Sequence, residues 1–161
     1  MTTRDIETAL CAYPSSPFYC RRYIAVPRAS WGIESHECDI LAVSKSGFAH
    51  EIEIKVSVAD LKKDLKKSHA HRSRDNKIAS LWFAAPSEML DAMLQYVPER
   101  AGIITVARHY SGKRYVTKVI RKPQRVKTAR PFSQNEVFQL ARLGTMRYWA
   151  QGKYAAQARK E

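Results

Sequence analysis

Three residues whose chemical types could act together on a phosphate group lie within residues 37–55, ECDILAVSKSGFAHEIEIK. They are Asp39, Glu53 and Lys55. Two carboxylates at neighbouring positions repel each other unless a cation lies between them. Mg²⁺ (or Mn²⁺) suits such a site because it takes oxygen ligands and keeps water in its remaining positions. The ion could activate water for attack on phosphorus, and the Lys55 ammonium could stabilise the negative charge that develops.

A β-hairpin is expected to position these residues. The turn SKSG, residues 44–47, predicts a three-residue loop with Gly47 in the left-handed conformation. The resulting register places Asp39 opposite Glu53, where Cβ atoms lie about 4.5–5.5 Å apart. The other face, which includes Cys38 and Ile40, is mostly apolar and is expected to enter the core. A solvated hairpin face with Glu–Lys cross-strand pairs has the same pattern, so the spacing alone leaves both interpretations open.

The net charge favours a polyanionic partner, most often nucleic acid. Lys and Arg number 28 against 15 acidic residues, which makes the formal net charge +13. The basic residues cluster after the hairpin, on the polar side of a predicted helix and in the loop that follows, and again after the last predicted strand. A solvated basic face is the alternative for the helix, but we expect phosphate contacts from part of the following set: Lys62, Lys63, Lys66, Lys67, His69, His71, Arg72, Arg74, Arg121 and Arg125.

The length of 161 residues predicts one domain over residues 1–150, followed by a polar basic tail over residues 151–161. No apolar run is long enough to span a bilayer, and the first residues do not have the pattern of a secretion signal. The three cysteines form no CxxC pair, so we expect free thiols in a reducing cytoplasm. No spacing supports a zinc site built from His69, His71 and a cysteine.

The remaining pattern predicts a mixed α/β domain with one central sheet. The last helix has the clearest start, because Ser133 and Glu136 have the spacing of a capping box, and it is expected to end near Trp149. The expected order is helix, three strands, helix, strand, helix, two strands and helix, at residues 4–11, 19–26, 37–44, 48–56, 57–68, 78–86, 87–97, 101–108, 114–121 and 133–149.

The residues of the hairpin resemble the PD-(D/E)XK nuclease pattern. Asp39 is followed fourteen positions later by Glu53-Ile-Lys55, although Cys38 stands where the proline of that pattern would be. The order helix, three strands, helix, strand also resembles the core of that superfamily. The stretches ECDILAVSKSGFAHEIEIKVSVADLKKDLKKSH, LWFAAP and VPERAGIITV make residues 31–108 similar to small phage-encoded and bacterial DNA-repair-type proteins of the MmcB-like group.

This resemblance implies a restriction-endonuclease-like αβββαβ core with a mixed central sheet, extended by C-terminal strands and a helix. It also implies a Mg²⁺- or Mn²⁺-dependent DNA nuclease, in DNA repair, recombination or processing in a bacterial or phage-infected cell. Asp39 and Glu53 would be metal ligands and Lys55 the catalytic lysine. Glu7, from the first helix, would be a further ligand, although a solvated helix residue is the alternative.

Glu37 and Glu51 share the predicted face and would be outer ligands, or Glu37 would pair with Lys55 and hold it in place. A homodimer is expected by analogy, because cutting both strands of a duplex usually requires two active sites. Two other interpretations remain open. One is a non-catalytic nucleic-acid-binding or host-interaction protein on a nuclease scaffold, and the other is a basic protein that binds another protein.

Overall fold

The computed structural model describes residues 1–29, 37–65, 77–112 and 114–157 of the chain. The order of elements is the one predicted from the sequence, with a short 3₁₀ helix, η1, added before the third α-helix. The elements are α1 (Thr3–Cys11), β1 (Tyr23–Ala29), β2 (Cys38–Ser44), β3 (Ala49–Ile54), α2 (Val58–Leu65), β4 (Ile78–Pro86), η1 (Ser87–Met89), α3 (Leu90–Tyr96), β5 (Gly102–Arg108), β6 (Tyr115–Arg121) and α4 (Gln134–Gln157).

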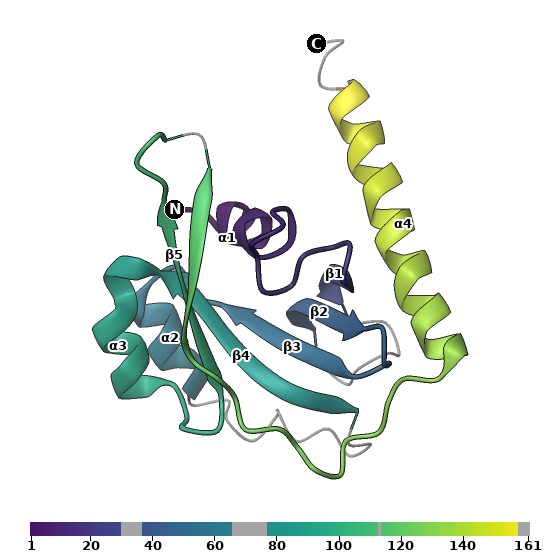
Figure 1. Cartoon of the computed structure of the whole chain (residues 1–161). Helices are drawn as coiled ribbons and strands as arrows, with labels where there is room; N and C mark the ends of the chain where they lie inside the picture. The colour runs from purple at the N-terminus through teal and green to yellow at the C-terminus, as the bar shows by residue number, and fades with distance from the viewer. Residues whose placement is uncertain (30–36, 66–76, 113, 158–161) are drawn as a thin grey trace.

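The strands form one mixed six-stranded sheet in the order β1-β2-β3-β4-β5-β6. β2 pairs antiparallel with both β1 and β3, β4 pairs parallel with both β3 and β5, and β6 returns antiparallel to β5. The parallel connection from β3 to β4 passes through α2, and the one from β4 to β5 passes through η1 and α3, as parallel strands require. The predicted α/β class and mixed central sheet are therefore confirmed (Figure 1).

The hairpin between β2 and β3 has the predicted turn and register. The N–H of Ser44 donates to the carbonyl of Phe48 at 3.0 Å, and Gly47 has a φ of 83°. Leu41 then lies opposite Glu51 across the ladder, as the sequence predicted. A non-glycine residue would be strained at this φ, so the turn and hence the register depend on Gly47.

Helices cover both faces of the sheet, but on one face the second half of β3 belongs to none of the apolar clusters beneath them. On one face α1 buries Ile6 in the main core cluster (Figure 1). On the opposite face, α2 and α3 pack over β4 and β5 through residues such as Leu61, while α4 packs over β1 and β2 through residues such as Leu140. β3 crosses this face between the two groups of helices, and there it carries Glu51 and Glu53.

At the end where Arg28 lies, the side chains of β1 and β2 no longer alternate regularly between the two faces of the sheet. Arg28 has a φ of 51°, and beyond it Ala29 pairs with Cys38. Cys38 packs in the same cluster as Leu41, whereas Ile40 packs in the cluster on the opposite face. The prediction that Cys38 shares a face with Ile40 is therefore wrong, because strict alternation does not continue through this point.

Helix α4 is longer than predicted. It begins with the expected capping box, in which the N–H of Glu136 donates to Ser133 Oγ at 3.3 Å and the Glu136 carboxylate accepts from the N–H of Ser133 at 2.8 Å. It then continues to Gln157 instead of ending near Trp149, so most of the expected tail is helical and extends away from the sheet (Figure 1). In the described part of the chain, no helix has the length and apolar character needed to cross a membrane.

Candidate active site

A buried ion pair lies at the carboxyl end of β3. Lys55 Nζ is 2.9 Å from Glu53 Oε2, and the two residues are only 5% and 7% exposed. The backbone N–H of Lys55 donates to the carbonyl of Ala84 at 2.9 Å, which continues the hydrogen bonding between β3 and β4 past the end of the strand. Removing two charges from water is costly, and a well-packed apolar pair is often at least as stable. Stability alone therefore does not explain why both charges are buried here.

Glu51 and Glu53 lie on the face of the sheet that carries the two groups of helices, between their apolar clusters. Glu51 lies opposite Leu41, which packs under α4, and Glu53 lies beside Phe83, which packs under α2 and α3. Laterally paired residues share a face of the sheet, so both glutamates occupy the strip between these two apolar clusters. Glu51 is 2% exposed, so this strip is polar but shielded from bulk solvent.

Asp39 occupies the fork where β2 and β3 separate. The described ladder between these strands ends at Ile40 and Ile52, and beyond it Asp39 Oδ2 accepts a hydrogen bond from the N–H of Ile54 at 2.7 Å. A carboxylate thus takes the place that a carbonyl oxygen would have in a continuing ladder. This contact holds Asp39 next to the backbone of Glu53, on the neighbouring strand that the sequence predicted.

The carboxylates at this fork repel one another. Burial raises the pKa of Glu53 above 4.5, the Lys55 ammonium opposes this shift, and the charges of Asp39 and Glu51 add to it. Each added negative charge makes the ionised form of Glu53 less favourable, whereas a cation makes it more favourable. A further cation near Glu53 would therefore lower its pKa, as the Lys55 ammonium does.

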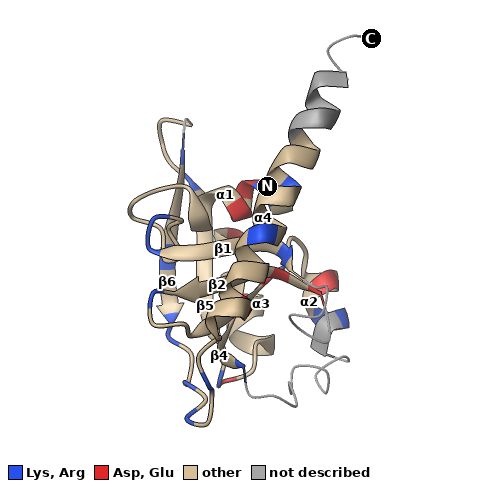
Figure 2. Ribbon diagram, turned by 90° about the vertical axis from the view of Figure 1, so that its right-hand side faces the viewer, with Lys and Arg blue, Asp and Glu red and all other residues tan. Residues whose placement is uncertain are grey.

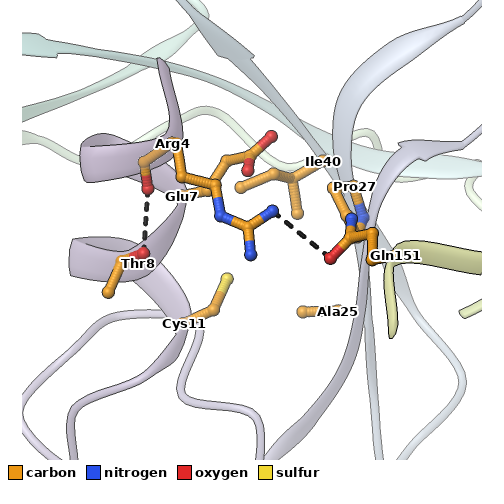
Figure 3. Close-up of a pocket in the computed structure, with 8 residues that line it drawn as sticks. All are labelled: Arg4, Glu7, Thr8, Cys11, Ala25, Pro27, Ile40 and Gln151. Atoms are coloured by element: carbon orange, nitrogen blue, oxygen red, sulfur yellow. Dashed lines mark hydrogen bonds between the residues drawn. The ribbon is translucent and has the colours of Figure 1, made fainter. Parts of the chain in front are cut away.

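Glu7 lies on α1, on the face of the sheet opposite to Glu51 and Glu53. It is half-buried, and its pKa is raised chiefly by burial, against the charges of Arg4 and Arg28, with a further upward contribution from Asp39. Glu7 lines a pocket between α1, β1, β2 and α4 (Figure 3). Asp39 thus acts electrostatically on Glu53 and on Glu7, which come from different elements.

The wider ligand set predicted from the sequence is not brought together. Within residues 1–29, 37–65, 77–112 and 114–157, no group of three or more His, Cys, Asp or Glu side chains is placed to hold a metal ion. Glu37 is exposed and lies beyond the end of the ladder that would have set it opposite Lys55. The pair Asp39 and Glu53 still fits Mg²⁺, because this ion is commonly bound by one or two carboxylates, with water and substrate phosphate as its other ligands.

Part of the predicted DNA-contacting set lies close to this site in the chain. α2 begins three residues after Lys55, and it carries Lys62 and Lys63, which are both exposed. Lys62 Nζ lies 4.8 Å from the ring centroid of Tyr96 on α3, so its position is partly defined by a cation–π contact. The remaining members of the first basic cluster lie outside the described residues: Lys66, Lys67, His69, His71, Arg72 and Arg74.

The second basic stretch lies elsewhere and is partly structural. The guanidinium of Arg121 donates to three carbonyls of residues 97–101 at 2.7–3.0 Å, so it holds the connection between α3 and β5. Arg125 lies 4.0 Å from the ring centroid of Phe48, which precedes β3, whereas Lys55 follows it. At about 3.3 Å per residue, the distance along β3 from Phe48 to Lys55 is on the order of 20 Å, so Arg125 lies far from the candidate active site. Figure 2 shows that basic residues lie on several sides of the molecule, including β6, the segment after it, α2 and α4.

Neither a protein-family model nor a curated protein matches this chain. A solved structure described as the SPO1766 protein of unknown function from Silicibacter pomeroyi is similar in fold, with a TM-score of 0.63 and 12% sequence identity. The similarity covers 100% of this chain and 95% of that one. It therefore extends to the whole arrangement of helices and strands, and at this identity it concerns the fold alone.

Proposed function

We propose that this protein is a Mg²⁺-dependent nuclease that hydrolyses phosphodiester bonds in DNA, on a fold of the PD-(D/E)XK nuclease type. The observation that carries the proposal is the buried Glu53–Lys55 pair beside Asp39 at the fork between β2 and β3. An acid on one strand and an acid and a lysine on the next are the groups that metal-assisted attack on a phosphodiester needs. The cost of burying these charges is consistent with a role in function.

Each residue has a defined part in this mechanism. Asp39 and Glu53 would hold Mg²⁺, which when bound would polarise the phosphate and make the attacking water more acidic. The N–H of Ile54 fixes the Asp39 carboxylate, and the ammonium of Lys55 fixes Glu53. With phosphate present, Lys55 could also donate to an oxygen on which negative charge increases during attack. The shielded strip on β3 strengthens these interactions by keeping bulk water away.

The charge of the chain supports DNA as the substrate. The net charge of +13 attracts a polyanion, and the exposed lysines of α2 follow the candidate catalytic strand directly. Contacts from such side chains go to phosphate oxygens, so they position the strand without reading its sequence.

A cleavage assay tests the proposal. Purified protein is incubated with circular, linear, single-stranded and branched DNA in Mg²⁺ and in Mn²⁺. We expect Asp39→Asn and Glu53→Gln to abolish cleavage and to retain DNA binding, because both changes preserve shape. Asp91→Asn is the matched control, since Asp91 is an exposed acid on α3, and it should cleave like the unmodified protein. Metal-dependent cleavage that persists in both site variants would refute the assignment.

A second candidate is a nucleic-acid-binding protein without catalytic activity. The observation that favours it is the Glu53–Lys55 pair itself, which already neutralises one of the two proposed ligands. It predicts binding to DNA that weakens steeply with salt, without turnover in either metal. The same assay separates the two candidates, because binding and cleavage are measured on the same DNA.

A further inference from the structure

Three aromatic side chains of α4 are largely exposed to solvent. Phe138, Tyr148 and Trp149 are 63%, 70% and 69% exposed. Trp82, by contrast, packs against the main core cluster and donates its indole N–H to Ser80 Oγ at 3.0 Å. Aromatic rings that stabilise a fold are buried in this way, so the rings of α4 contribute little to the core.

Two of these rings lie along one stripe of the helix. Trp149 follows Phe138 by about three turns, so the two side chains lie within about 20° of each other around the helix axis and about 16 Å apart along it. Arg142 and Thr145 are exposed on the same stripe between them. Thr145 donates its hydroxyl back to the carbonyl of Ala141 at 3.1 Å. The stripe therefore presents an aromatic ring on each side of a guanidinium.

Tyr148 widens the stripe at its distal end. The centroids of the Tyr148 and Trp149 rings are 5.4 Å apart and their planes are inclined at 79°, which is an edge-to-face arrangement. Both rings stay about 70% exposed in this arrangement, so each has apolar surface that a ligand can cover. Contiguous exposed apolar groups of this kind mark an interaction surface.

The opposite side of α4 fixes the helix on the sheet. Leu140 is buried in the cluster over β1 and β2, and Gly144 lies so close to Val26 that an added Cβ would be 3.1 Å from that side chain. Further along, Arg4 Nη1 of α1 lies 3.4 Å from Gln151 Oε1, which is a weak hydrogen bond (Figure 3). The helix is thus supported over about three turns, and the aromatic stripe has a defined position on the molecule.

The charge of this part of the chain favours a polyanion as the ligand. Glu136, at the start of α4, already pairs with Lys77 and Arg130. Two copies of the chain that met through this face would bring basic groups together without acids to balance them, which disfavours a second copy. From residue 137 to residue 160 the sequence contains no Asp or Glu, and its basic residues are Arg142, Arg147, Lys153, Arg159 and Lys160.

We propose that the outer face of α4 binds a single-stranded stretch of nucleic acid, with bases stacked on Phe138, Tyr148 and Trp149. The guanidinium of Arg142 pairs with a phosphate between them. Aromatic rings interleaved with a cation suit single-strand binding, because every base has a π-face that can stack. At about 3.4 Å per stacked nucleotide, a stripe of about 16 Å accommodates about five. The inference goes beyond the proposed function, since this surface is separate from the candidate active site and requires no cleavage.

Fluorescence anisotropy in EDTA tests the proposal with three labelled probes of equal length: a single strand, a duplex and a single strand without bases. We expect Trp149→Ala to weaken binding of the single strand about fivefold or more, and of the other two probes less than about twofold, because neither offers a free base. Leu94→Ala, at an exposed apolar residue of α3, is the matched control and should change every affinity less than about twofold. Arg142→Ala should lower the salt dependence by about one phosphate contact, and Trp149→Ala should leave it unchanged.

Tryptophan emission reports the stacking directly. An unlabelled single strand should quench the emission of the unmodified protein, and Trp149→Phe should lose much of this quenching. Because the phenylalanine ring can still stack on a base, Trp149→Phe should retain more affinity for the single strand than Trp149→Ala.

The proposal is overturned if Trp149→Ala weakens all three probes equally or no more than Leu94→Ala does, or if quenching is undiminished in Trp149→Phe. Sedimentation tests for a second copy: a dimer that Trp149→Ala dissociates, with unchanged affinity for the single strand, assigns the face to self-association and excludes the nucleic acid. Failure of the nuclease proposal is seen separately. A protein that never cleaves DNA but shows the selective loss in Trp149→Ala retains this site, whereas normal cleavage without that loss excludes the site and leaves the nuclease proposal standing.

Discussion

Replacing Lys55 by methionine tests whether the ion pair on β3 is buried as described. Lys55 and Glu53 are 2.9 Å apart and almost completely shielded, so the substitution leaves a buried carboxylate without the ammonium that neutralises it. Breaking a buried pair in this way costs about 3–5 kcal/mol. We expect the free energy of unfolding to fall by about 3 kcal/mol at neutral pH, and Tm by about 6–12 °C for a domain of this size.

The double variant Lys55→Met/Glu53→Gln should recover part of this loss. It removes both charges, and replacing a whole buried pair by groups of similar volume is often close to neutral. We expect the double variant to lose about 1 kcal/mol, which corresponds to a coupling of about 2 kcal/mol or more between the two sites. The measurement is urea unfolding followed by tryptophan fluorescence, with EDTA present so that no divalent ion adds stability.

The pH dependence gives a second check of the same pair. The pKa of Glu53 is raised in the folded protein, so this carboxyl group loses its proton at a lower pH in the unfolded chain than in the folded one. As the pH rises above 4.5, ionisation of Glu53 therefore lowers the free energy of unfolding. The loss caused by Lys55→Met should therefore shrink as the pH falls toward 4.5. Lys118→Met, at an exposed lysine of β6, is the control and should change stability by less than about 0.5 kcal/mol. Additive losses in the double variant, or a single-variant loss as small as the control's, would refute the buried pair.

Three further substitutions have defined outcomes. Glu7→Gln should stabilise the metal-free protein at pH values above the raised pKa of Glu7, because it removes a partly buried charge, and it should have little effect at lower pH. Thermal unfolding at several pH values measures this, and destabilisation at neutral pH would contradict it. Glu136→Gln should cost about 1 kcal/mol at neutral pH, because it weakens the cap of α4 and the pairing with Arg130 that holds its pKa well below the usual range. This loss should disappear as the pH falls through the folded-state pKa, and a loss that persists in acid would exclude the ionic contribution. Gly102→Ala would place a Cβ 2.3 Å from the ring of Trp82, so urea unfolding should show a loss of about 1–3 kcal/mol, and an unchanged midpoint would show that the ring moves aside freely.

The parts of the fold that were predictable depend on a few residues close together in the chain. Gly47 specifies the hairpin turn, and the turn then specifies which residues of β2 and β3 lie opposite each other. Ser133 and Glu136 specify the start of α4 in the same way. The position of Asp39 next to the strand that carries Glu53 could therefore be predicted from the sequence, because only 14 positions separate the two residues.

Features that depend on distant segments were missed. The left-handed Arg28 reverses the alternation of its own strand and of β2, and no residue type marks it, since this conformation is rare outside glycine and asparagine. Arg121 is predicted to contact DNA because it belongs to a basic run, and its hydrogen bonds to carbonyls about twenty residues earlier in the chain could not be foreseen from that run. Arg4 and Gln151 are 147 positions apart, so only the fold brings them together.

The hydrogen bond from Ile54 to Asp39 affects how any mutational survey of this protein is interpreted. Because the Asp39 carboxylate accepts a hydrogen bond that joins β2 to β3, truncation to alanine removes both this strand-to-strand contact and a candidate metal ligand. Loss of activity in an Asp39→Ala variant could thus result from separation of β2 and β3 or from loss of a metal ligand, and the variant alone does not distinguish the two. Asparagine keeps an oxygen that can accept the hydrogen bond from Ile54 while it removes the charge. Comparison of the alanine and asparagine variants therefore separates the structural role of residue 39 from its proposed role as a metal ligand.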